Sequence, residues 1–230
     1  MKYYAVKLGV NPGIYTTWAE CSKQVVGFKG AIYKSFETKE EAEEFMSKDK
    51  QTFDDEINFS KMETFVFVDG SFNDNTEVYG GGYFIFHKNE KSTLFLEGMV
   101  SGEDDDLKSI KNVAGELLAA KSAIVRAMFK NFKEIYIFFD YQGIESWADG
   151  TWDAHTTGTK AYKKFIEKCE DKIKIHFIKV KGHSNVMMND YVDLLAKRAC
   201  GVEVPDVTLI STKNKLFKVL GMEVIEDADK

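Results

Sequence analysis

The sequence predicts an α/β fold in which helices flank a mixed β-sheet, preceded by a small N-terminal α/β unit. Three strand-like runs between residues 64 and 100 are followed by alternating helical and strand-like segments, a pattern typical of a mixed sheet. A polar, acidic stretch without a clear period separates this region from the first 48 residues. We therefore expect a unit over 1–48, a linker over 49–63, a main domain over 64–200 and a C-terminal extension over 201–230.

The composition is that of an ordinary globular protein, with 44% hydrophobic and 30% charged residues in a chain of 230. No apolar run is long enough to cross a membrane, and the N-terminus lacks the apolar core of a signal peptide. The three cysteines lie far apart, without the spacing of a zinc site, and fit free thiols in a reducing compartment. We therefore expect a cytoplasmic protein without a membrane partner.

The N-terminal unit is expected to contain two strands and two helices. Residues 2–9 alternate as a strand does, and 31–36 form a second strand-like run. A helix begins at Thr16 or Thr17, because threonine is a favourable N-cap. The next helix begins at the capping box T-x-x-E of residues 38–41.

The main domain opens with strand-like runs over 64–69, 80–87 and 92–100, the second of which begins at three consecutive glycines. The acidic segment EDDD that follows is expected to be a solvated loop. Helix and strand then alternate, with elements expected over 112–130, 135–140, 159–170, 173–180 and 187–199. In the C-terminal extension, VTLIS is expected to be a short strand and KNKLFKVLG a short helix.

Two of the buried strands are expected to end in an aspartate. The run FVFV stops at Asp69, and IYIFF, the strongest apolar run in the chain, stops at Asp140. For Asp69 the structural alternative is a turn opened by Asp-Gly. Strand ends in α/β sheets also carry chemistry, because a rigid strand aims the side chain. Two core strands that each end in a carboxylate favour a functional site.

Two helices add one carboxylate each. Glu116 shares a helix face with three alanines, and Asp193 shares one with Asn189 and Ala196, so both point toward the sheet. The alternatives are a glutamate stabilised by the helix N-terminus and an aspartate that caps a helix or faces solvent. Four carboxylates aimed at one place would repel one another, and a hard divalent cation such as Mg²⁺ resolves this conflict.

These segments resemble type 1 ribonuclease H over about 64–200. The matching motifs are FVDGS, GELLAA, FFDYQGIESW and VKGHSNVMMNDYVDLLAK. The resemblance implies a ribonuclease H-like fold and a metal-binding quartet of Asp69, Glu116, Asp140 and Asp193 that holds two Mg²⁺ ions, with Mn²⁺ as a substitute. It also implies endonucleolytic hydrolysis of the RNA strand of RNA–DNA hybrids, which leaves 5′-phosphate and 3′-hydroxyl ends.

Further roles follow from the same resemblance. His183 corresponds to a loop histidine that assists proton transfer or product release, although a histidine after a glycine in a loop is otherwise common. Gly115 would allow close approach of the RNA backbone. The full set of implied substrate contacts is Gly70, Ser71, Asn112, Gly115, Trp147 and Asn189. Polar contacts among them suit recognition of the 2′-hydroxyl groups of RNA.

Aromatic residues after the third acid fit the family's channel for the DNA strand. These are Trp147 and Trp152, with core packing as the alternative for each. Thr156 and Thr157 are candidates for contact with a DNA phosphate. Some members of the family carry a basic helix and loop between the third and fourth acids, and this sequence departs from that pattern over 148–160.

Residues 1–48 resemble the viroplasmin-like hybrid-binding domain attached to many such enzymes, through YYAVKLG, NPGIYTTWAEC and GFKGAIYKSF. Residues 1–36 hold five lysines and one glutamate, a net charge of +4 that suits a phosphate backbone, whereas the whole chain carries −6. The resemblance implies contacts by Trp18, Tyr33, Lys34 and Ser35. The alternative is that Trp18 and Tyr33 form the core of this small unit. The expected partner is an RNA–DNA hybrid, with double-stranded RNA as a second ligand of this unit.

Two other functions fit parts of the sequence. A non-catalytic protein that binds RNA–DNA hybrids or double-stranded RNA would use the N-terminal unit, but it has no need of four carboxylates. Another nuclease or a strand-transfer enzyme on a related fold would use the carboxylates. It would use neither the KGH element of residues 181–183 nor the N-terminal unit. We expect a monomeric endonuclease whose tethered N-terminal unit raises the local concentration of the substrate.

Overall fold

The computed structural model describes residues 2–8, 10–26, 32–47, 59–180 and 187–223. The chain divides into two compact units, Met1–Asn58 and Phe59–Lys230. The second unit begins before the expected residue 64, with the short 3-10 helix η3 (Phe59–Lys61). The ring of Phe59 packs 5.3 Å from that of Phe138, between ring centroids, so this segment is part of the folded domain. In the described part of the chain, no helix combines the length and the apolar character needed to cross a membrane.

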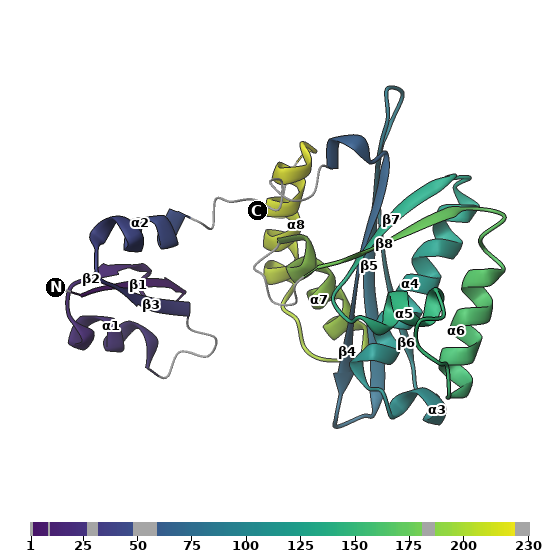
Figure 1. Ribbon diagram of the computed structural model, residues 1–230, viewed down its shortest axis with the longest axis horizontal. Coiled ribbons are helices and arrows are strands. Elements are labelled where there is room, and N and C mark those ends of the chain that lie inside the picture. The colour runs from purple at the N-terminus through teal and green to yellow at the C-terminus, as the bar shows by residue number, and fades with distance from the viewer. Residues whose placement is uncertain (1, 9, 27–31, 48–58, 181–186, 224–230) are drawn as a thin grey trace. The chain divides into compact units, whose positions relative to one another are not determined.

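The first unit is a three-stranded antiparallel sheet in the order β2-β1-β3, with one helix on each face (Figure 1). Its elements are β1 (Tyr3–Leu8), β2 (Gly13–Tyr15), α1 (Trp18–Val25), β3 (Ile32–Phe36) and α2 (Lys39–Ser47). Val6 packs against Cys21 and Val25 of α1 to form the core. Strand β2 was not predicted, because three residues are too few to show a period.

Both helices of the first unit begin directly after a threonine, as the sequence predicts for an N-cap. Thr17 is the N-cap of α1, and its hydroxyl accepts a hydrogen bond from the N–H of Glu20. Thr38 and Glu41 exchange two hydrogen bonds of 3.2 Å each, which confirms the predicted capping box. Such caps contribute about 1 kcal/mol each to helix stability.

The second unit is built on a five-stranded mixed sheet in the order β6-β5-β4-β7-β8, which confirms the predicted fold class. Its strands are β4 (Thr64–Asn73), β5 (Val78–Lys88), β6 (Thr93–Gly102), β7 (Glu134–Phe139) and β8 (Lys174–Lys179). The first three are antiparallel neighbours. Strand β7 is parallel to β4, and β8 is parallel to β7.

Helices cover both faces of this sheet (Figure 1). On one face lie α4 (Asn112–Phe129), α5 (Gly143–Ala148) and α6 (Thr157–Glu167). On the other lie α7 (Met187–Ala199) and α8 (Asp206–Leu220). The alanine stripe of α4 is fully buried against the strands, as its spacing predicts.

Several local predictions were wrong. Helix α3 (Asp105–Lys108) includes the last two acids of the segment expected to be a loop, and α5 was not predicted. VTLIS lies within α8 and is not a strand, because Pro205 precedes this helix and Gly221 ends it at a φ of 66°. Strand β4 does not stop at Asp69, since its pairing with β5 continues to Asn73.

The three consecutive glycines lie inside β5 and bring two helices into contact with the backbone of the sheet. A Cβ atom on Gly81 would lie 2.2 Å from the carbonyl oxygen of Gly115 on α4. A Cβ atom on Gly82 would lie 2.3 Å from the carbonyl oxygen of Val192 on α7. Because alternate residues of a strand face opposite sides, one glycine run admits a helix on each face.

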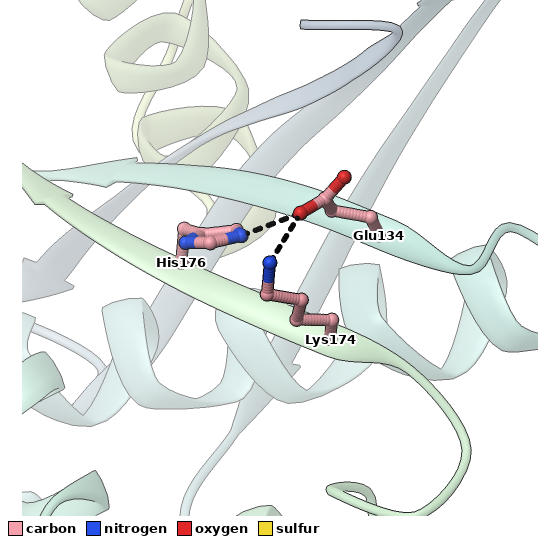
Figure 2. Close-up of polar contacts among 3 residues, drawn as sticks. All are labelled: Glu134, Lys174 and His176. Carbon is pink, nitrogen blue, oxygen red and sulfur yellow. Dashed lines mark hydrogen bonds and ion pairs between the residues drawn. The ribbon is translucent and has the colours of Figure 1, made fainter.

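A polar cluster on the surface joins the beginnings of β7 and β8 (Figure 2). Glu134 accepts hydrogen bonds from Lys174 Nζ at 2.9 Å and from His176 Nε2 at 2.8 Å. These two donors hold the pKa of the Glu134 carboxyl below its usual value. Because Glu134 begins β7 and Asp140 follows its end, roughly 20 Å of strand separates this cluster from the acidic residues described below. The cluster therefore stabilises the register between β7 and β8. It is not part of the site formed by the acidic residues.

The substitution Gly81→Ala is expected to destabilise the second unit by about 3 kcal/mol, the upper end of the cost of overpacking, because its Cβ would meet backbone that cannot move aside. Denaturant unfolding measures the change. The matched control is Gly13→Ala in β2, where the nearest atom to the added Cβ lies 3.6 Å away, an ordinary contact. Equal, small effects of both substitutions would contradict the close helix–sheet contact.

Candidate active site

Four elements bring the predicted carboxylates together where β4 and β7 diverge. The two strands pair only through residues 65–67 and 136–138. Asp69 on β4 and Asp140, which follows the end of β7, therefore lie two residues beyond the last shared pair. Glu116 lies in the second turn of α4, and Asp193 lies in the middle of α7.

Glu116 is the most deeply buried of the four, with 2% of its surface exposed. Its Oε1 accepts a hydrogen bond from the N–H of Asp140 at 3.2 Å. Gly70 lets α4 come this close, because a Cβ there would lie 2.5 Å from the backbone nitrogen of Glu116. Burial, and then the charges of Asp140 and Asp69, raise the pKa of Glu116 well above its usual value.

The ionisation of Asp69 is affected by two of the other three carboxylates. Burial, followed by repulsion from Asp140 and Asp193, raises the pKa of Asp69 to about 8. The N–H of Gly70 donates to its Oδ1 at 2.7 Å and partly offsets this effect. Asp140 and Asp193 thus lie near enough to Asp69 to disfavour its ionisation, and perturbed groups such as Asp69 and Glu116 are typical of functional sites.

The donor chemistry of this site fits a hard divalent cation, because carboxylate oxygens are the ligands such ions prefer. Positive charge would also relieve the repulsion that raises the pKa of Asp69 and Glu116. Among the residues that the structure describes, however, no three acidic, histidine or cysteine side chains are arranged around a common metal position. Asp193 pairs instead with Lys197, one turn further along α7, at 2.5 Å.

Lys197 is the residue of this site that the sequence analysis missed. Its spacing of four residues after Asp193, on the same helix, is the signal that predicts the ion pair.

The other predicted contacts of the second unit differ in their exposure. Asn112 is exposed at the start of α4, and Ser71 is half-buried on β4. Asn189 is 9% exposed, and its Oδ1 has no hydrogen-bond partner within the described residues. Such an atom is unusual in a folded protein. The prediction for His183 falls on a residue outside the described part of the chain.

Two predicted substrate contacts have packing roles. Gly115 is buried, and a Cβ there would lie 2.0 Å from the carbonyl oxygen of Gly80, so the missing side chain serves the contact between α4 and the sheet, while its contact with an RNA backbone stays a prediction. Trp147 is 9% exposed and belongs to the hydrophobic core. Its ring lies 5.9 Å from that of Trp152, which is 41% exposed. The core-packing alternative is therefore correct for Trp147.

Thr156 and Thr157 lie at the start of α6. Thr156 is the N-cap, and its hydroxyl accepts a hydrogen bond from the N–H of Thr159 at 3.2 Å. Thr157 is the first residue of the helix and is exposed.

The N-terminal unit presents an aromatic surface. Trp18 and Tyr33 are 47% and 45% exposed, with ring centroids 5.8 Å apart, and the ring of Tyr4 also lies 5.8 Å from that of Trp18. Lys34 and Ser35 follow on β3 and are exposed. The core of the unit consists of other residues, so the alternative that Trp18 and Tyr33 form it is wrong.

Comparison with known proteins identifies both units. Residues 61–201 match the model of the RNase H family. The chain belongs to the ribonuclease H family. Residues 2–46 match the ribonuclease H1 N-terminal domain. Enzymes of the ribonuclease H family generally use divalent metal ions, in agreement with the carboxylate donor set.

Individual curated relatives of this chain match mostly over short segments. Ribonuclease H of Crithidia fasciculata is 51% identical over 45 residues, which is 20% of this chain and 9% of the relative. The first three curated relatives are each matched over 16% of their length or less. Human ribonuclease H1 is 24% identical over 253 residues, covering 85% of this chain and 88% of the human protein.

A likeness in fold extends to solved structures. LC9-RNase H1, described as a type 1 RNase H with the type 2 active-site motif, superposes with a TM-score of 0.50 at 16% identity. The alignment covers 72% of this chain and 88% of that one.

The substitution Asp69→Asn is expected to stabilise the chain in chelator by about 1–3 kcal/mol near pH 8, because it removes one buried charge from the group. The folded-state pKa of Asp69, about 8, lies above its ordinary value of 3.8, so wild-type stability falls as the pH rises through this interval. The asparagine does not titrate. Its advantage should therefore vanish near pH 4 and grow toward pH 8, which urea unfolding at several pH values measures.

The control for this prediction is Asp153→Asn, which changes an exposed carboxylate. It should alter stability by less than about 0.5 kcal/mol at any pH. A stability gain of Asp69→Asn that does not depend on pH would contradict the repulsion.

Proposed function

We propose that this chain is an endonuclease that hydrolyses the RNA strand of RNA–DNA hybrids and leaves 5′-phosphate and 3′-hydroxyl ends. The observation that carries the proposal is the meeting of four carboxylates where β4 and β7 diverge, in surroundings that raise the pKa of Asp69 and Glu116. Membership of the ribonuclease H family and the exposed aromatic surface of the N-terminal unit support a nucleic-acid substrate.

Two Mg²⁺ ions, with Mn²⁺ as a substitute, would be held by Asp69, Glu116, Asp140 and Asp193. When bound, such ions activate water and stabilise the leaving oxygen of a phosphodiester. The N–H of Asp140 orients Glu116 for this task, and strand β4 holds Asp69 rigidly. Asp193 would exchange its ion pair with Lys197 for the metal, at little cost because ion pairs this exposed contribute about 1 kcal/mol or less.

Recognition of RNA would rest on polar groups around the carboxylates. Asn112 and Ser71 offer donors and acceptors at the site, and the amide of Asn189 would add to them. A 2′-hydroxyl is the group that distinguishes RNA from DNA at a given position.

The N-terminal unit would supply affinity without sequence readout, through Trp18, Tyr33, Lys34 and Ser35, and would also accept double-stranded RNA. Exposed aromatic rings pack against nucleotides, and lysines neutralise phosphates. We further propose that the enzyme acts as a cytoplasmic monomer. The three unpaired cysteines, all buried, support a reducing compartment.

The deciding experiment is cleavage of an end-labelled RNA–DNA hybrid by the full chain, with Mg²⁺ or with chelator. The wild type should cut only the RNA strand and only with the metal, because the carboxylates need a cation to act. Asp140→Asn should lower kcat by at least about 100-fold, since it removes a metal ligand. Asp153→Asn is the control and should retain full activity.

Other outcomes favour the other functions. Binding of the hybrid without cleavage, under both Mg²⁺ and Mn²⁺, would favour a non-catalytic binding protein. Cleavage of a DNA duplex included in the same assay would favour a different nuclease on this fold.

The substitution Trp18→Ala is expected to weaken hybrid binding about 10-fold, as loss of one aromatic platform does. It should raise KM and leave kcat unchanged, because the carboxylates lie on the other unit. Fluorescence anisotropy with a labelled hybrid measures the affinity. The control is Val26→Ala, which removes an apolar side chain of the same unit that is 72% exposed. Equal effects of the two substitutions would assign the binding surface elsewhere.

A further inference from the structure

Helix α8 lies beyond the segment that matches the RNase H family, which ends at residue 201. It nevertheless packs along α7, the helix that carries Asp193 (Figure 1). We propose that Glu97, Tyr191 and Lys213 form a clamp through which α8 and the edge strand β6 hold α7 in the orientation that presents Asp193. The three are positioning residues, and the inference rests on the proposed role of Asp193.

One carboxylate oxygen joins the three elements. Oε2 of Glu97, on β6, accepts a hydrogen bond from the hydroxyl of Tyr191 on α7 at 2.6 Å. The same oxygen pairs with Nζ of Lys213 on α8 at 2.8 Å. A charged acceptor makes stronger hydrogen bonds than a neutral one, so this oxygen is an effective junction.

The clamp is partly shielded from solvent. Tyr191 is fully buried, the side chain of Lys213 is 18% exposed and that of Glu97 is 36% exposed. The ammonium group of Lys213 lies 5.5 Å from the ring centroid of Phe95 and 5.6 Å from that of Phe217, which themselves pack edge to face. Salt therefore screens this ion pair less than it screens a fully exposed one.

The geometry of α7 explains why the clamp bears on Asp193. Two residues correspond to about 200° of rotation around a helix, so Tyr191 and Asp193 point to nearly opposite sides of α7. The glycines of β5 set the distance of α7 from the sheet, and buried apolar side chains such as Val192 and Leu195 pack α7 there without a preferred direction. The hydrogen bond at Tyr191 adds a directional contact to this packing, which fixes the rotation of the helix and, through it, the direction of Asp193.

A second contact ties the start of α8 to the end of α7. Nη2 of Arg198 donates to the carbonyl oxygen of Val204 at 2.7 Å and to Oδ1 of Asp206 at 2.5 Å. Helix α8 is thus attached at its first residue and again two turns later at Lys213. A helix fastened at two points acts as a rigid brace along α7.

The experiment compares the full-length wild type with Lys213→Met, Tyr191→Phe and the control Lys215→Met, an exposed lysine of the same helix. We expect Lys213→Met and Tyr191→Phe to lower kcat and to raise the Mg²⁺ concentration for half-maximal rate, each about tenfold, as loss of a hydrogen bond to a charged group does. KM for the hybrid should change less than about twofold, because the N-terminal unit supplies much of the affinity. Lys213→Arg should restore both values, since its guanidinium can reach the same oxygen.

Hydrogen exchange measures the order of α7 directly and does not depend on activity. In metal-free protein, hydrogen exchange should accelerate in the amides of α7 in Lys213→Met and Tyr191→Phe, while the amides of β4 and β5 stay protected. Calorimetric titration with Mg²⁺ alone should show weakened binding in the same two variants.

The outcomes distinguish a positioning role of the clamp from a role in general stability. Unchanged kcat, Mg²⁺ requirement and exchange in an active Lys213→Met enzyme would overturn the clamp. Faster exchange throughout the sheet, with lowered Tm and no rescue by arginine, would overturn it too, because it would indicate general stability rather than positioning. Failure of the wild type to cleave the hybrid would refute the proposed function, whereas exchange and Mg²⁺ binding would still test the clamp.

Discussion

Close contact between two helices and the backbone of β5 determines where the acidic side chains lie. Gly81 admits α4 on one face of the sheet, and Gly82 admits α7 on the other. Gly70 on the neighbouring strand extends the contact with α4 to Glu116. A side chain at any of these positions would lift a helix by an ångström or more, and the carboxylate on that helix would leave the site. The distance of both helices from the sheet therefore depends on the absence of side chains beneath them.

The close contact between helices and sheet also makes the carboxylates destabilising to the folded state. Backbone contact excludes water, and Glu116 is consequently almost wholly buried. Buried carboxylates that face one another resist ionisation, which accounts for the raised pKa of Asp69 and Glu116. The fold tolerates this arrangement because a large apolar core on the α4 face, together with the stacked rings of Phe67 and Phe138 on the other, stabilises the two strands that carry the aspartates. Strain of this kind is expected where a site is prepared for a cation.

Much of this arrangement could be predicted from the sequence, because periodicity and residue chemistry are local. The helix over 187–199 has the predicted bounds, and the four acids were identified from strand ends and helix faces. What sequence could not supply depends on contacts between distant segments. Strand β4 continues past Asp69 because β5 pairs with it, and Gly115 lies against the backbone of β5. VTLIS has β-branched residues typical of a strand, but packing against α7 and helix-ending signals make it helical.

The distribution of charge separates two regions of the chain. Residues 1–36 carry a net charge of +4, whereas residues 37–58 carry −6 and residues 59–230 carry −4, which together give the −6 of the whole chain. The positive charge is therefore confined to the segment that presents Trp18, Tyr33 and Lys34. An acidic domain repels phosphate at long range, and this sequence departs over 148–160 from the basic helix and loop that some family members carry. Under the proposed function, the aromatic and basic surface of residues 1–36 would bind the hybrid, and its attachment to the same chain would raise the local concentration of substrate near the carboxylates. Affinity and chemistry would then lie on different units, so the acidic site could keep the carboxylates that it needs.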